Sequence, residues 1–229
     1  MKQTMKTMLA AVVVMMTVTY VGCGKEENNS SNATVEWVDL GLPSGLLWAS
    51  CNVGASAPVE YGDYYAWGEI GTKNVYEWST YAYGDAGDKL SKYCNKPEYG
   101  LNGFTDNLTT LSPNDDVAAI WLGNGARIPS REEWQELLDN TTVEWTSVDG
   151  VNGCLCTAVN GNSLFLPAAG FREGSKLWYA GRDGLYWSAS LNTDRPFQAW
   201  DFEFDEYAQG MEDAHRLEGQ SVRAVHSAF

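Results

Sequence analysis

Hydrophobic and polar residues alternate with a period of two along several short runs of this chain, which is the pattern of half-buried β-strands. The clearest run is AWDFEFD at 199–205, in which aromatic residues alternate with carboxylates. Because successive side chains of a strand point to opposite faces, we expect one core face and one solvated face. The core face would hold Trp200, Phe202 and Phe204, and the solvated face Asp201, Glu203 and Asp205.

Two pairs of apolar runs are joined by turn residues and predict β-hairpins. The first covers residues 36–54, with Pro43, Ser44 and Gly45 at its turn. The second covers residues 153–171, where Asn160 and Gly161 predict a two-residue turn with positive φ. Further strands or extended segments are expected at 61–69, 184–191 and 220–226.

Helical spacing is clearest in RIPSREEWQELLDN at 127–140. Ser130 followed three residues later by Glu133 is a capping box, which marks a helix start. Trp134, Leu137 and Leu138 then recur at helical spacing and should face a core. The chain therefore predicts a single α+β domain of short antiparallel strands and long loops, with one well-marked helix starting near Ser130.

The loops of this domain are expected to carry its binding function. Residues 76–110 hold scattered Tyr, Gly and Asn without a period, which is typical of a long ordered loop. The segment 192–218 is rich in carboxylates and aromatic residues, and beyond the alternating run we expect it to be an irregular insert between two strands.

The amino-terminus has the pattern of an export signal. Lys2 and Lys6 precede an apolar run from Met8 to Val21, which is too short for a permanent membrane span. Gly22 before Cys23 suits lipoprotein processing, so residues 1–22 would be a signal peptide and Cys23 the lipid attachment site; an ordinary cleaved signal is the alternative. Residues 23–34 are polar and predict a flexible tether, which leaves residues 35–229 as the domain.

Composition and charge limit the classes of partner that this protein is expected to bind. The formal net charge of −15 repels phosphate backbones, so nucleic acid is not an expected partner. Ten Trp and twelve Tyr, with 23 Gly, supply amphipathic rings and turns for a β-rich or loop-rich surface.

The cysteines leave their pairing open. Cys51, Cys94, Cys154 and Cys156 remain after Cys23, and export would permit disulfides. Cys154 and Cys156 share one strand face at a spacing poor for a direct bond. No C-x-x-C occurs and there are two histidines, so no zinc site is expected.

A family resemblance rests on seven motifs that occur in register between Trp37 and Val225. They are WVDLGLPSGLLWASCNVGAS, YGDYYAWGE, GFTDNLTTL, ARIPSREEW, NGNSLFLPAAGFR, GLYWSASLNTD and GQSVRAV. In this order they resemble the Fibrobacter major paralogous domain family, a branch of the C-type-lectin-like, formylglycine-generating-enzyme-like fold. The tether after Cys23 resembles the export signal of surface lipoproteins of the Bacteroidetes type.

The resemblance implies a C-type-lectin-like fold in which some residues form the framework and others bind the ligand. It places ligand-facing residues in a variable segment, here 192–218. It implies no oxidase activity, because no cysteine follows Cys156. The framework positions would be Arg127, Pro129, Ser130, Glu133, Trp134, Gly184, Trp187 and Ser188. The candidate ligand-binding residues are Arg195, Phe197, Trp200, Asp205, Glu206, Tyr207, Met211 and His215.

The catalytic alternative has a weaker basis in the sequence. No nucleophile motif or dinucleotide loop is present, so no catalytic residues are assigned. The carboxylates of the 201–205 strand face are the alternative, as a glycan-active enzyme or accessory module. No cofactor is expected, although a calcium ion held by Asp205, Glu206, Glu212 and Asp213 stays open.

The sequence thus predicts a lipid-anchored, surface-exposed outer-membrane lipoprotein with a non-enzymatic binding or adhesion domain. Its partner would be a glycan or a protein of a host or neighbouring cell, because aromatic and Arg anchors dominate recognition and rings stack on sugar faces. A structural interaction protein of the cell envelope is the third interpretation.

Overall fold

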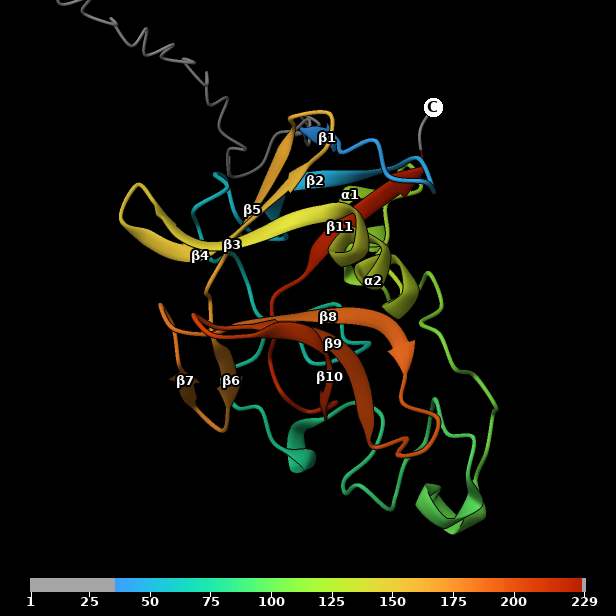
Figure 1. Cartoon of the computed structure of the whole chain (residues 1–229). Coiled ribbons are helices and arrows are strands. Elements are labelled where there is room, and N and C mark those ends of the chain that lie inside the picture. The colour runs from blue at the N-terminus through green and yellow to red at the C-terminus, as the bar shows by residue number, and fades with distance from the viewer. Residues whose placement is uncertain (1–35, 228–229) are drawn as a thin grey trace, which may run out of the picture.

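Short antiparallel strands form the frame of the protein (Figure 1), and the computed structural model describes them within residues 36–227. The predicted signal peptide, Cys23 and the whole of the predicted tether lie outside these residues. The first sheet, in the order β1–β2–β11, contains β1 (Trp37–Asp39), β2 (Leu46–Asn52) and β11 (Arg223–Ser227). The second, β3–β4–β5, contains β3 (Thr141–Val148), β4 (Val151–Ala158) and β5 (Ser163–Pro167). The third, β10–β9–β8, contains β8 (Gly184–Leu191), β9 (Gln198–Phe204) and β10 (Gln209–His215), and β6 (Phe171–Glu173) pairs with β7 (Lys176–Trp178).

The first sheet joins the two ends of the described chain. β2 pairs with β1 and, on its other edge, with β11, so the predicted 36–54 hairpin is confirmed and extended by a distant strand. The fully buried Arg223 donates from Nε to Asn52 Oδ1 at 2.9 Å and from Nη2 to the Phe165 carbonyl at 3.1 Å. This guanidinium therefore ties the first sheet to β5 of the second.

The second sheet contains one strand, β3, that the sequence pattern did not predict. β3 turns into β4 through Asp149 and Gly150, both at positive φ (50° and 83°), which is the geometry of a two-residue hairpin turn. The predicted two-residue turn at Asn160 and Gly161 was wrong. Of these two residues Gly161 alone has a positive φ, at 86°, and the strands are separated by residues 159–162.

The third sheet shows that the 192–218 segment is more regular than expected. Residues 209–215 form β10, which pairs with β9 along its whole length from Gln209↔Phe204 to His215↔Gln198. The irregular insert is therefore a β-hairpin. Gly, Glu, Asp and Ala are poor strand formers, so the pairing with β9, and not local propensity, decides this strand.

The predicted helix and its cap are confirmed as α2 (Arg131–Asn140) with Ser130 at the N-cap. Trp134 is fully buried, with its ring 4.8 Å from Trp48 of β2 and 5.1 Å from Phe202 of β9. α2 thus fills the space between the first and third sheets (Figure 1). A second helix, α1 (Val117–Leu122), was not predicted and is capped by Asp116.

The prediction of one buried and one solvated face for β9 was wrong at Asp201 and held only in part at Trp200 and Glu203, which are both half-buried. Phe202 and Phe204 are buried as expected, but Asp201 on the opposite face is fully buried too. The cause is residues 61–69, which form a single bridge, Tyr65↔Gln220, and no strand. They cover this face of the third sheet, since Trp187 of β8 donates from Nε1 to the Tyr65 carbonyl at 2.7 Å.

The remaining chain between β2 and α1 consists of loops with three short 3-10 helices. They are η1 (Trp78–Thr80), η2 (Pro97–Tyr99) and η3 (Leu101–Gly103). Antiparallel β-structure with few helices fits the α+β expectation. No helix within residues 36–227 has the length and apolar character to cross a membrane. The four cysteines of this region are free thiols, and burial raises the pKa of Cys154 and Cys156 to about 12.

Close packing of β8 on β9 makes Gly184 a sensitive position. A Cβ there would lie 2.1 Å from the Phe204 ring. We expect Gly184→Ala to lower the free energy of unfolding by about 1–3 kcal/mol through overpacking. Gly210 of β10 has open space around the same position, so Gly210→Ala should change it by less than about 0.5 kcal/mol. Urea unfolding measures both, and equal effects would contradict this packing.

Candidate functional site: an aromatic row and an acidic groove

The eight predicted ligand-binding residues do not form one site. Arg195, Phe197 and His215 lie where β9 begins and β10 ends. Asp205, Glu206 and Tyr207 lie at the hairpin tip, at the far end of β9. Trp200 and Met211 lie between these groups, on the core-facing side.

At the hairpin tip, Asp205 stabilises the turn itself. Asp205 Oδ1 accepts hydrogen bonds from the backbone N–H of Tyr207 (2.6 Å) and Ala208 (2.8 Å), which closes the hairpin. Glu206 is exposed and Tyr207 is 87% exposed. Tyr207 is therefore accessible, but the length of β9 separates it from Phe197 and His215.

Trp200 and Met211 are half-buried. The Arg131 guanidinium of α2 covers the Trp200 ring at 3.7 Å from its centroid, a cation–π contact. Met211 packs against the main hydrophobic core. Both side chains pack the hairpin against the body of the protein, so little of their surface is free to contact a ligand.

Phe197 and His215 belong to a set of four successively neighbouring rings that we call the aromatic row. Neighbouring ring centroids are 6.4 Å apart for Trp78 and His215, 5.7 Å for His215 and Phe197, and 5.4 Å for Phe197 and Tyr99. His215 is exposed and the other three are half-buried. The row thus joins the 76–110 loops to the 192–218 segment, two regions that the sequence suggested as separate binding candidates.

The backbone at Gly87 and several polar side chains lie beside the aromatic row. A Cβ on Gly87 would lie 3.3 Å from Phe197 and 3.6 Å from Trp78, so the chain at Gly87 packs directly beside both rings. Arg195 forms an ion pair with Asp213 at 2.6 Å. The Asp213 carboxylate also accepts from Asn192 Nδ2 at 2.6 Å.

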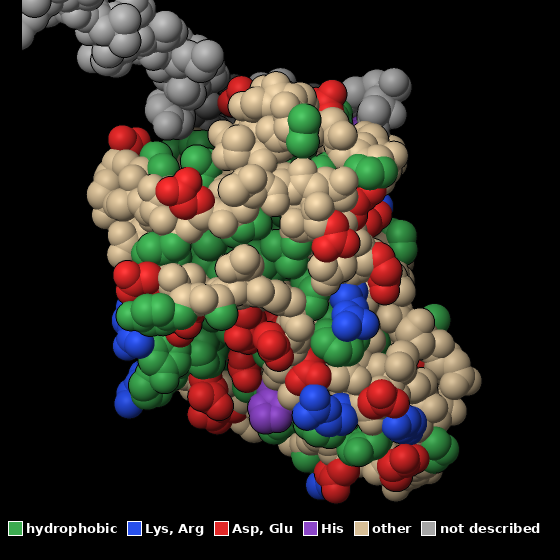
Figure 2. Space-filling model, viewed as in Figure 1, with side chains coloured by type: hydrophobic (Ala, Val, Ile, Leu, Met, Phe, Trp, Pro, Cys, Tyr) green, Lys and Arg blue, Asp and Glu red, His purple; other side chains and the backbone are tan. Residues whose placement is uncertain are grey.

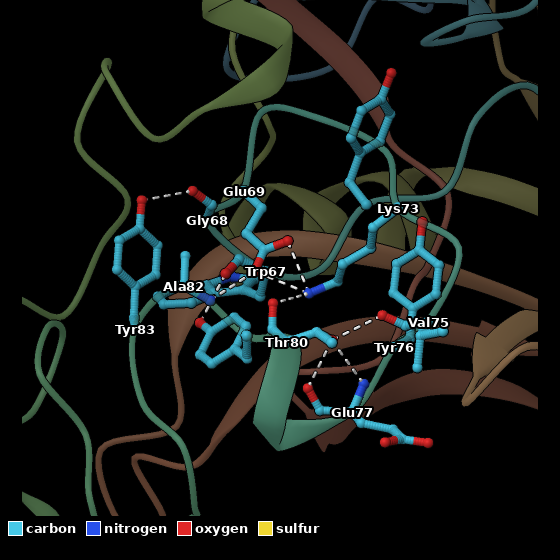
Figure 3. Close-up of polar contacts among 12 residues, drawn as sticks. Trp67, Gly68, Glu69, Lys73, Val75, Tyr76, Glu77, Thr80, Ala82 and Tyr83 are labelled. Atoms are coloured by element: carbon cyan, nitrogen blue, oxygen red, sulfur yellow. Dashed lines mark hydrogen bonds and ion pairs between the residues drawn. The ribbon is translucent and has the colours of Figure 1, made fainter.

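An ion pair holds the loop that presents Trp78 (Figure 3). Lys73 Nζ lies 2.9 Å from Glu69 Oε2 and also donates to the Thr80 carbonyl at 3.0 Å. Glu69 Oε1 accepts from the Ala82 N–H at 2.8 Å. Both charged side chains are mostly buried, so residues 69–82 close around this pair and place η1 at the surface.

The buried Arg216 connects the two halves of the row. Its guanidinium donates to Tyr81 Oη (2.9 Å) and to the carbonyls of Lys92 (3.0 Å), Tyr93 (3.1 Å) and Pro196 (2.8 Å). The first three acceptors belong to the long loop, and Pro196 directly precedes Phe197. The position of Phe197 relative to the loop aromatics therefore depends on Arg216.

A second surface feature, the acidic groove, lies on the opposite face of the third sheet. It has a volume of about 200 Å³. Four carboxylates line it, those of Asp183, Glu203, Asp205 and Glu212, together with Leu185, Phe204 and residues 208–210. Figure 2 shows acidic side chains gathered over the β9–β10 hairpin.

Buried carboxyl groups adjoin this groove. Asp201 is directly opposite Glu212 across the β9–β10 pair, and Gln220 Nε2 donates to its Oδ2 at 2.7 Å. Burial and the neighbouring Glu203 raise the pKa of Asp201 well above its usual range. Burial and Glu212 raise the pKa of Glu203, which is hydrogen-bonded to Asp201. Burial and Glu173 raise the pKa of Glu218 to about 7.

Two carboxylates of the calcium set that the sequence left open are engaged by other groups. Asp213 is bound by Arg195 and Asn192, and Asp205 closes the hairpin turn. Within residues 36–227 no group of three or more His, Cys, Asp or Glu side chains is placed to hold a metal ion.

The fold and these two features define a class: an antiparallel β protein with few helices and a surface of clustered rings and carboxylates. No protein-family model, curated protein or solved structure matches the chain.

The sequence did not predict Trp78 or Tyr99 as binding residues. Each stands alone in an irregular loop, and no spacing rule relates either one to Phe197. The density of aromatic residues in 76–110 was the available signal, and it identified the region without the residues.

Removing the Arg216 guanidinium should destabilise the whole protein. Arg216→Met would leave one hydroxyl and three carbonyl acceptors buried without this donor, so we expect a loss of about 3–5 kcal/mol in the free energy of unfolding. The matched control is Arg195→Met, because Arg195 is half-exposed and its surface ion pair should contribute less than about 1 kcal/mol. Urea unfolding compares the two, and a similar loss in both variants would refute this role of Arg216.

The raised pKa of Glu218 makes stability depend on pH. The folded state binds the proton more tightly than the unfolded state, so this stabilisation is complete below a pH of about 4.5 and is lost as the pH rises through about 7. Glu218→Gln should remove it and flatten the dependence of Tm on pH between 5 and 8, by an amount on the order of 1 kcal/mol in stability. Thermal scans at both pH values test this, and an unchanged slope in the variant would show that Glu218 titrates normally.

Proposed function

We propose that this protein is a lipid-anchored, surface-exposed outer-membrane lipoprotein whose C-type-lectin-like domain binds a glycan without catalysis. The observation that carries the binding part is the aromatic row, formed by Trp78, His215, Phe197 and Tyr99. Aromatic faces stack on the apolar faces of sugar rings, and several neighbouring rings can contact more than one sugar of a chain. The signal pattern ending at Cys23 and the order of the seven motifs support the anchor and the fold.

Polar side chains beside the aromatic row favour a carbohydrate ligand over a purely apolar one. Arg195 is half-exposed next to Phe197, and it is held by Asp213, which also accepts from the buried Asn192. The Arg195 guanidinium can therefore exchange hydrogen bonds with sugar hydroxyls. A protein ligand of a host or neighbouring cell would use the same rings as anchors. Recognition in this proposal uses the 192–218 segment together with the 76–110 loops.

The test is a glycan and host-protein array screen of the purified protein, with and without calcium. We expect binding that falls at least about tenfold in the variant Trp78→Ala, Phe197→Ala, because each ring removed from a recognition hot spot costs about 2 kcal/mol. The matched control is Tyr207→Ala, an exposed ring outside the row, which should bind as the parent does. Circular dichroism of each variant confirms that it is folded.

Three other outcomes would redirect the proposal. Equal loss in the Tyr207→Ala variant would move recognition to the hairpin tip. Turnover of a bound glycan would favour the glycan-active alternative, with Glu203 of the acidic groove as the first residue to replace. Absence of binding on every array would favour a structural role in the cell envelope.

A further inference from the structure

The outer edge of β3 has no partner strand in the described part of the chain. β3 is the end strand of the second sheet and pairs with β4 alone (Figure 1). Val148 and Val151 close the two-residue turn between them, and a pair in that position exchanges backbone hydrogen bonds. Alternate residues of β3 therefore direct their N–H and C=O groups to β4, while Val143, Trp145 and Ser147 direct theirs outward. No backbone group within residues 36–227 outside this hairpin is hydrogen-bonded to these three residues.

The other sheet edges of the described chain are covered, short or acidic. β8 is covered because the Ser221 N–H donates to the Leu185 carbonyl at 3.2 Å, and β11 is bridged to Arg127. The Phe165 carbonyl of β5 accepts from the Arg223 guanidinium. β1, β6 and β7 have three residues each, and β10 carries two acidic residues and a glycine. β3 thus differs from every other edge of residues 36–227.

β3 lacks the features that protect a free edge. Its sequence is TTVEWTSV, which consists mainly of β-branched and aromatic residues, the strongest strand formers. It contains no Pro or Lys, its one charged residue is Glu144, and it pairs with β4 at eight successive positions without a bulge. Natural edge strands are usually short, bulged or interrupted by charges and prolines, so a long regular edge indicates a partner strand.

The sequence of β3 is compatible with antiparallel pairing to a second copy of itself. In such a pair, residues with outward backbone groups face one another. When Trp145 faces Trp145 of the second copy, Val143 faces Ser147 and Glu144 faces Thr146. A shift in one direction would place Glu144 opposite itself, and like charges in facing positions are destabilising. A shift in the other direction would shorten the overlap at the hairpin turn.

The same register would cover apolar surface that β3 leaves half-buried. Val143 and Trp145 pack against the main hydrophobic core, and the Trp145 ring lies 6.3 Å from the Phe204 ring. With the two Trp145 residues facing each other, both rings lie on the same side of the joined sheet, where the exposed part of each can contact the other. The pairing therefore satisfies backbone groups and buries aromatic surface together.

We propose that β3 pairs with β3 of a second copy about a two-fold axis at Trp145, which joins the second sheets of two molecules into one continuous sheet. The predicted tether, residues 23–34, is rich in Asn, Ser and Glu, which are poor strand formers, so a second copy suits this edge better than the chain's own tether. No residue of β3 belongs to the aromatic row, so the dimer is independent of the proposed glycan binding.

The first experiment measures the mass of the full protein by sedimentation velocity over a range of protein and NaCl concentrations. Cys23→Ser in every sample excludes association through an attached lipid. We expect a reversible monomer–dimer equilibrium that shifts toward the dimer as salt increases, because each copy has a formal net charge of −15 and salt screens their repulsion. A monomer under all these conditions would overturn the proposal and leave the edge to a strand of another protein.

A matched pair of variants tests whether the backbone of β3 forms the interface. Ser147→Pro removes one outward N–H and leaves the hydrogen bonds to β4 in place, as proline is tolerated on edge strands. We expect the dimer to weaken about tenfold or more, because two hydrogen bonds are lost per dimer. Ser147→Ala keeps the N–H and should dimerise as the parent does. An equal effect of both variants, or of neither, would contradict edge pairing.

Cysteine cross-linking tests the register without relying on the proline variant. The proposed pairing brings position 144 of one copy opposite position 146 of the other, with Cβ atoms about 4.5–5.5 Å apart. A mixture of Glu144→Cys and Thr146→Cys proteins should form disulfide-linked dimers on mild oxidation, and either protein alone should form few. The parent measures the background from Cys51, since Cys94, Cys154 and Cys156 are buried. Equal cross-linking in either variant alone would refute this register.

Discussion

The structure depends on two fully buried guanidinium groups. Arg216 takes the place of regular secondary structure in the long loop, and Arg223 joins the first sheet to the second. Arg216 gathers one hydroxyl and three carbonyls around the long loop, and Arg223 gathers carbonyls and an amide from β2 and β5. Irregular backbone leaves carbonyls without strand or helix partners, and an arginine with five fixed donors satisfies several of them at once. The rings of Trp67, Tyr81 and Tyr93 surround the Arg216 guanidinium and complete this centre.

The organisation around Arg216 explains how a loop-rich region can present a fixed surface. Trp78 is fixed by the Lys73–Glu69 pair, and Phe197 follows a proline whose carbonyl is bound by Arg216. Preorganised rings lose little conformational entropy on binding, so the aromatic row has a physical basis for affinity beyond its area. Buried polar interactions in the body of the protein thus support apolar recognition at its surface.

The β9–β10 hairpin carries two different chemistries because its faces have different neighbours. One face packs Phe202 and Met211 on the core, and its end contributes Phe197 and His215 to the row. The other face holds Asp201, Glu203 and Glu212, where residues 61–69 and 218–220 remove part of the solvent. Burial of acids with a strongly negative net charge explains why the pKa values here are raised and not lowered.

The sequence by itself determined the elements that local rules control. The capping box at Ser130 and Glu133, the 36–54 hairpin and the aromatic face of β9 follow from hydrogen bonding within a turn and from side-chain periodicity, and the structure contains all three. The sequence also indicated Phe197 and His215 as candidate site residues. Only the tertiary structure decided that Asp201 is buried, that 209–215 is a strand, and that Trp78 and Tyr99 lie beside Phe197. The burial of Asp201 and the placement of Trp78 and Tyr99 depend on residues 61–69 and on the loop around Arg216, which are distant in sequence, and no local pattern encodes contacts of that range. The strand at 209–215 depends on its pairing with the neighbouring β9, which overrides the poor strand propensity of its own residues.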